Sequence, residues 1–73
     1  MIKELDRVIL TRDIPENNLK KGDLGIVVMI HSNTNGFEVE FSTLDGDTIT
    51  VVTLNSEDVR EFRKHEIAHA RVI

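Results

Sequence analysis

The sequence predicts a small, mainly β domain built from five to six short strands. The chain is rich in Val, Ile and Thr, whose branched side chains are stiff and suit a pleated sheet. Its 4 glycines and 1 proline divide the 73 residues into short segments. Within several segments apolar and polar residues alternate, as they do in Phe37–Ser42, and this period of two is typical of half-buried strands.

The expected strands lie between these breaks, and two further features interrupt the first half of the chain. A long polar loop covers residues 12–21 and contains Pro15, and Lys21-Gly22-Asp23 forms a tight turn after it. Gly25, inside the second strand, indicates a bulge or a close crossing of strands. The predicted strands cover residues 5–11, 24–31, 37–42, 48–54 and 59–63.

Two glycine turns and a short helical turn connect the remaining strands. Asn35-Gly36 and Asp45-Gly46 are expected to form hairpin turns, because these residues tolerate positive φ. Residues 55–58 are expected to form a 3₁₀ turn capped by Asn55 or Ser56, and the tail 65–73 to be extended. These elements predict a single domain, residues 1–73, with the architecture of a small SH3-like (KOW-like) barrel.

The Asp45-Gly46 hairpin decides which aliphatic side chains of the fourth strand point outward. A two-residue loop places Phe41 opposite Thr50, whereas a type I turn with a Gly bulge places it opposite Ile49. In either register two aliphatic residues lie outward beside Glu38 and Glu40, and either the tail (Ile67, Val72, Ile73), a partner or a second copy must cover them. This outward pair is either Ile49 and Val51 or Val52 and Leu54. The candidate partner-binding residues are Arg12, Asp13, Glu38, Glu40, Val52 and Leu54.

Composition excludes several classes of function. Thirteen acidic residues outnumber 9 basic ones, so the net charge of −4 argues against nucleic acid and anionic lipid as partners. Without Cys there is no disulfide, thiolate metal site or Cys nucleophile. Without Tyr or Trp the polyproline and base-stacking modes lose their aromatic groups, and the three Phe residues are expected in the core. No apolar segment approaches the ~20 residues of a membrane span, and no secretory leader is evident, so a cytoplasmic location is expected.

One short motif resembles a catalytic metal site. His65-Glu66-Ile67-Ala68-His69 matches H-E-x-x-H, which on a helix holds zinc between two His. Such a site needs a third ligand, and in an extended segment the two His are about 13 Å apart, too far to share an ion. We therefore expect no enzyme activity, no catalytic residue, no metal and no cofactor.

Three stretches together resemble the bacterial domain-of-unknown-function family 4926. They are residues 5–15, residues 19–28, and residues 37–41 with 51–54. The resemblance implies a small cytoplasmic SH3-like protein, often encoded beside a larger partner gene, and it implies no activity. Residues 66–69 also fit the pattern of this family, whereas His65 does not.

These observations predict a non-catalytic protein-interaction module. Its expected partner is a protein or a second copy, with the role of an accessory or immunity-type subunit for a neighbouring gene product. The alternative is a KOW-like domain associated with RNA or the ribosome, because residues 20–27 resemble the glycine-containing KOW stretch. Lys20 and Lys21 alone form a weak electrostatic footprint for that role.

Overall fold

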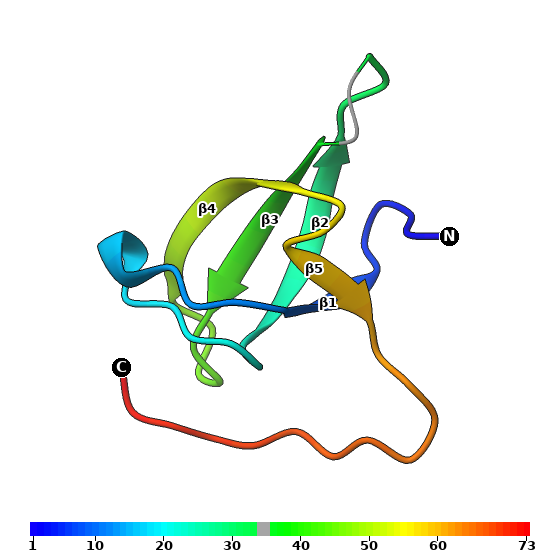
Figure 1. The fold of residues 1–73 in the computed structure, drawn as a ribbon. Helices are drawn as coiled ribbons and strands as arrows, with labels where there is room; N and C mark the ends of the chain where they lie inside the picture. The colour runs from blue at the N-terminus through cyan, green and yellow to red at the C-terminus, as the bar shows by residue number, and fades with distance from the viewer. Residues whose placement is uncertain (34–35) are drawn as a thin grey trace.

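The computed structural model describes residues 1–33 and 36–73 of the chain (Figure 1). In these residues all five strands belong to one antiparallel sheet with the order β4-β3-β2-β1-β5, and the helical element is a single 3₁₀ turn, η1. The prediction of a mainly β fold is confirmed. The elements are β1 (Arg7–Leu10), η1 (Pro15–Asn17), β2 (Leu24–Ile30), β3 (Gly36–Ser42), β4 (Thr48–Asn55) and β5 (Val59–Glu61).

One face of the curved sheet encloses the hydrophobic core. The alternation in β3 places its three apolar side chains on this face, and β1, β2, β4 and β5 add residues from both sides. The core is therefore made almost entirely by inward positions of the strands. Its buried members are Val8, Leu10, Ile14, Leu19, Val27, Phe37, Val39, Phe41, Leu54 and Val59.

The long first loop is not simply a polar connection. Ile14 and Leu19 pair as an isolated bridge and are each only 3% exposed, so the loop adds two side chains to the core. Pro15 begins η1, because its fixed φ suits the first helical position. The turn Lys21-Gly22-Asp23 forms as predicted, with φ 95° at Gly22 and a 2.9 Å hydrogen bond from Asp23 N to Lys20 O.

A 3₁₀ turn was predicted at residues 55–58, but within the described residues the 3₁₀ element is η1, so this prediction is wrong in its position. These residues form a hydrogen-bonded turn in which Asp58 N donates to Asn55 O at 3.0 Å. The Asp58 carboxylate accepts from Asn55 N at 3.0 Å, so Asp58 caps the turn rather than Asn55 or Ser56. The predicted Asn35-Gly36 turn lies partly outside the described residues; Gly36 itself begins β3.

The register of β3 and β4 settles which side chains point outward. Phe41 lies opposite Thr50, as a two-residue loop predicts, although the turn spans Leu44–Gly46 and closes with Thr43 N donating to Asp47 O at 2.8 Å. A bulge at Ile49 compensates for the longer turn, because Ser42 pairs with Thr48.

This register corrects two of the candidate partner-binding residues. Leu54 lies opposite Phe37 and is only 2% exposed, and Val52 lies opposite Val39 and packs against the core. Both share the inward face of the aromatic residues, so neither belongs to the outward surface. The outward aliphatic residues of β4 are Ile49 and Val51.

Gly25 provides the close approach of β2 to β3 that its position predicts. A Cβ atom there would lie 2.5 Å from Val39 Cγ1 and 2.9 Å from Phe41 Cε1. The bulge of β2 lies elsewhere, between Val27 and Met29, and it ends the strict alternation of this strand. Gly25 therefore serves packing, because only a residue without a side chain fits between β2 and the β3 core residues.

The tail after β5 is extended and pairs with no strand of the described residues (Figure 1). Ile67 and Val72 are 93% and 96% exposed, so neither covers the outward aliphatic residues of β4, whereas Ile73 is 48% exposed and lines a groove together with Ile49. Phe62 was predicted to lie in the core, within a strand of residues 59–63. It is 63% exposed instead, and β5 ends one residue before it, at Glu61. No helix in the described part of the chain has the length and apolar character to span a membrane.

The corrected register gives a direct stability test. Leu54→Ala removes buried methyl groups from the core and should lower the free energy of unfolding by about 2–5 kcal/mol. Val51→Ala, three residues earlier but outward, should cost less than about 1 kcal/mol. Urea unfolding of both variants measures the difference. Equal losses would mean that the register is wrong.

Gly25 gives a second test. Gly25→Ala should destabilise the fold by about 1–3 kcal/mol, because the new methyl group collides with Val39 and Phe41. In a Val39→Ala background the nearest collision is absent, so the same substitution should cost less. A double-mutant cycle measured by urea unfolding checks this, and strictly additive losses would contradict the close approach.

Candidate functional site

The outer face of β2, β3 and β4 gathers exposed apolar side chains around two carboxylates. Ile26 and Val51 flank Glu40 in one row across the sheet, and Met29 flanks Glu38 in the next row. The three apolar residues are 37%, 50% and 52% exposed, respectively. Directly opposed residues in an antiparallel sheet have Cβ atoms about 4.5–5.5 Å apart, so these side chains form one surface. We call Ile26, Met29, Glu38, Glu40 and Val51 the outer patch.

The two carboxylates of the outer patch are held by neighbouring donors. Thr48 Oγ1 donates to Glu40 at 2.7 Å, and Thr53 Oγ1 donates to Glu38 at 2.7 Å. His31 Nε2 lies 2.6 Å from Glu38 Oε2, the oxygen that also accepts from Thr53 at 2.7 Å. These contacts, first that of His31 and then that of Thr53, hold the pKa of Glu38 below its ordinary value. The patch therefore offers apolar contact beside negative charge.

Arg12 and Asp13, the candidate residues of the first loop, lie in a different network. Arg12 Nε donates to Asp58 Oδ1 at 2.8 Å and so ties the loop to the turn before β5. Asp13 Oδ1 accepts from Lys21 N at 2.8 Å and closes the loop on itself. Both side chains serve the fold, and none of these bonds joins them to Glu38 or Glu40. Contact of Arg12 and Asp13 with a partner stays a prediction.

Asp58 is the charged residue most enclosed by this network. It is 8% exposed, and Arg12 Nε and Asn55 N both donate to its carboxylate. The hydrogen bond from Arg12 and then that from Asn55 hold the pKa of Asp58 below its ordinary value. The charged form of this carboxyl group therefore stabilises the folded chain.

The H-E-x-x-H stretch does not adopt the helical geometry of a zinc site. His65 has φ 69°, and residues 65–69 form no helix. Glu66 instead accepts two hydrogen bonds from the Arg60 guanidinium, at 2.9 and 2.6 Å, and one from Arg63 N. These bonds, with Arg60 the larger cause, lower the pKa of Glu66 to about 2. In the part of the chain that the structure describes, no three His, Asp or Glu side chains are grouped to hold a metal.

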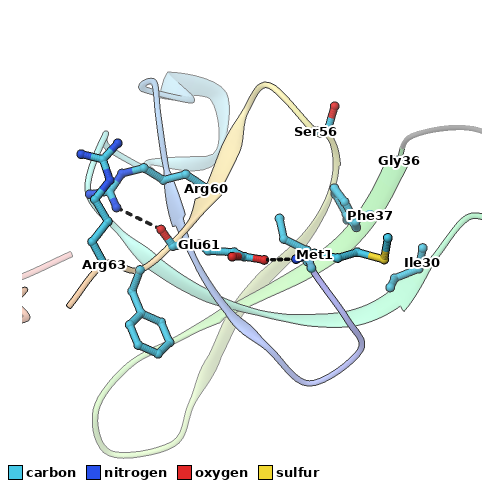
Figure 2. Close-up of a pocket in the computed structure, with 10 residues that line it drawn as sticks. Met1, Ile30, Gly36, Phe37, Ser56, Arg60, Glu61 and Arg63 are labelled. Carbon is cyan, nitrogen blue, oxygen red and sulfur yellow. Dashed lines mark hydrogen bonds and ion pairs between the residues drawn. The ribbon is translucent and has the colours of Figure 1, made fainter.

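Figure 2 shows a hollow that the sequence analysis missed. Met1, Ile30 and Phe37 line its apolar side, and the Met1 ammonium group lies 2.9 Å from Glu61. Phe62 also lines it, since this ring is not in the core. No sequence pattern pointed to it, because Phe62 was expected in the core, within a strand of residues 59–63. The hollow brings none of the predicted site residues together.

The Arg12–Asp58 contact predicts a pH dependence. A carboxyl group with a lowered folded-state pKa stabilises the fold above its unfolded pKa, about 3.9, and this stabilisation is lost as pH falls through the folded pKa. Asp58→Asn should cost about 1–3 kcal/mol at pH 7 and make the loss of stability below about pH 4 shallower.

Urea unfolding midpoints between pH 7 and pH 2 measure this effect. Glu57→Gln is the control, because Glu57 is the exposed neighbouring carboxylate. If the acid limb of Asp58→Asn stays parallel to that of the unmodified chain, Asp58 does not carry this charge effect.

Comparison with known proteins adds one finding to this geometry. A search of curated proteins and a search of solved structures returned no match. A sequence model of one family, described as Domain of unknown function (DUF4926), matches residues 4–61. The match covers all five strands and ends at β5, so it does not extend to residues 66–69, which were expected to fit as well. Because the match spans well over half of the chain, this protein belongs to the DUF4926 family.

Proposed function

We propose that this protein is a non-catalytic protein-interaction module that binds a partner through the outer patch. One observation carries the proposal: Ile26, Met29 and Val51 stay 37–52% exposed on adjacent positions of a sheet face. Single exposed apolar residues are normal on a protein surface, but a contiguous group is typical of an interaction site. The chain's own tail leaves these side chains open, since Ile67 and Val72 point into solvent.

The proposal includes an SH3-like barrel as the scaffold. The strand order β4-β3-β2-β1-β5 and the long first loop support it. The strong curvature of the sheet in Figure 1 also favours a barrel. In the described residues β4 and β5 do not pair with each other, so the sheet does not close fully into a barrel. A bacterial cytoplasmic setting and the accessory or immunity-type role belong to the same proposal and rest on the family resemblance.

The charges of the outer patch define the chemistry of the partner. Glu40 lies between Ile26 and Val51, Glu38 lies beside Met29, and the chain as a whole carries −4. A partner surface with an apolar centre and basic groups around it complements this arrangement. The alternative RNA-binding role has less support, because Gly22 and Gly25 of the KOW-like stretch serve a turn and core packing.

Affinity capture with matched variants tests this proposal. The unmodified chain should retain a protein from lysate of its native cell, and Ile26→Lys or Val51→Lys should lose it. Ile67→Lys, which changes an exposed aliphatic residue outside the outer patch, should retain it. Quantitative mass spectrometry identifies the retained protein.

Two results would refute the outer patch. One is equal retention by all four proteins. The other is capture of RNA with a steep dependence on salt concentration, which would instead support the KOW-like alternative.

A further inference from the structure

The end of the tail lies in a groove beside the start of β2, the turn between β3 and β4, and the start of β4. Arg71 makes the polar contacts there: its Nε and Nη2 donate to the two oxygens of Asp23 at 2.8 and 2.5 Å. Nη2 also donates to Asn18 O at 2.8 Å. Beside this arginine, residues 68–73 share the groove with Leu24, Leu44 and Ile49. We call Asp23 and the Asn18 carbonyl the arginine socket.

The first loop builds the arginine socket without help from the tail. Asp23 ends the tight turn before β2, and Lys20 N donates to its carboxylate at 2.8 Å. Asn18 follows η1 with φ 62° and ψ 27°, a left-handed conformation that ends the helical turn. Both acceptors are thus fixed by local hydrogen bonds. The pKa of Asp23 lies below its ordinary value, first because of Arg71, so the socket is anionic.

The tail itself is weakly attached to the rest of the fold. Within the described residues, no backbone hydrogen bond involves residues 67–73. Val72 is 96% exposed and Ile73 is 48% exposed, so the tail buries little apolar surface. The core cluster contains no tail residue, and the family match ends before the tail. The contacts of Arg71 and Glu66 therefore hold a segment that adds no residue to the core.

We propose that this groove is a binding site for an extended partner segment in which an arginine precedes aliphatic residues, and that Ala70–Ile73 is its resident intramolecular ligand. A guanidinium fork matches the two carboxylate oxygens of Asp23, whereas a lysine offers only one ammonium group. Leu24 and Ile49 line the same groove and offer apolar contact to an aliphatic side chain after the arginine; in the tail this residue is Ile73, which is 48% exposed, because Val72 is 96% exposed. A segment tethered to the same chain has an effective concentration in the mM range, so a partner must outcompete it.

This inference rests on the proposed interaction role, but not on the outer patch as the surface used. The socket and groove contain none of Ile26, Met29, Glu38, Glu40 or Val51. Because the two surfaces share no residue, variants of one surface test it separately from the other.

A labelled peptide with the sequence of Ala68–Ile73 tests the site by fluorescence anisotropy on the full chain. Arg71→Ala frees the socket, so this variant should bind the peptide at least about 5-fold more tightly than the unmodified chain does. Adding Asp23→Asn to Arg71→Ala should remove most of that binding. Lys64→Ala, a nearby change outside the socket, should behave like the unmodified chain.

Further measurements keep the outcome decisive. If the double variant does not fold, a peptide with lysine in place of its arginine should still bind Arg71→Ala about 5-fold less tightly. No binding to Arg71→Ala, or equal binding of the arginine and lysine peptides, would overturn the site. If Ile26→Lys loses peptide binding, the peptide binds at the outer patch. That result would refute the socket but not the proposed function. A dimer of the unmodified chain that Arg71→Ala dissociates would show a second copy as the occupant.

Discussion

The inward row of β3 is the constraint on which the rest of the structure depends. Phe37, Val39 and Phe41 must leave water together, and a one-residue slip of either neighbouring strand would place that strand's polar side against them. On one side the row selects the register that buries Leu54. On the other side it leaves so little room that β2 must present Gly25. These two contacts, together with the bulges of β2 and β4, decide which residues of both strands lie on the surface.

A short chain with one core cannot cover both faces of its sheet. Small domains bury only about 60% of the surface that the unfolded chain exposes, and no helix of the described residues lies over the outer face. The exposure of the apolar residues of the outer patch follows from this small buried fraction. These residues are also adjacent to one another, and hydrogen bonds hold the two carboxylates beside them. Self-burial by the tail was the simplest alternative. The tail lies beside Ile49, but Ile67 and Val72 stay exposed and the groove of the tail contains no residue of the outer patch.

Period-two patterns and glycine turns were sufficient to predict the strands, because both are local properties. The location of the core residues was harder to predict where it depends on distant partners. Ile14 and Leu19 looked like isolated aliphatic residues in a polar loop, and only the bridge between them turns both inward. Val52 and Leu54 could not be assigned to a face, because the extra residue in the turn is cancelled by the bulge at Ile49. The arginine socket joins Asn18 and Asp23 to Arg71, a contact across 48 residues or more that no local pattern encodes.

The socket and the outer patch meet on one strand. Leu24 lines the groove and Ile26 belongs to the outer patch, and outward residues two positions apart on a strand are separated by about 7 Å. The arginine socket and the outer patch therefore border each other along β2. The Arg71–Asp23 ion pair is partly buried, with side chains 29% and 19% exposed, but within the described residues no backbone hydrogen bond of residues 67–73 supports it, so few contacts hold the end of the tail. A partner that matches the same socket and also covers Ile26 and Val51 gains apolar contact that the tail does not make, and this difference gives the partner the advantage over the tail.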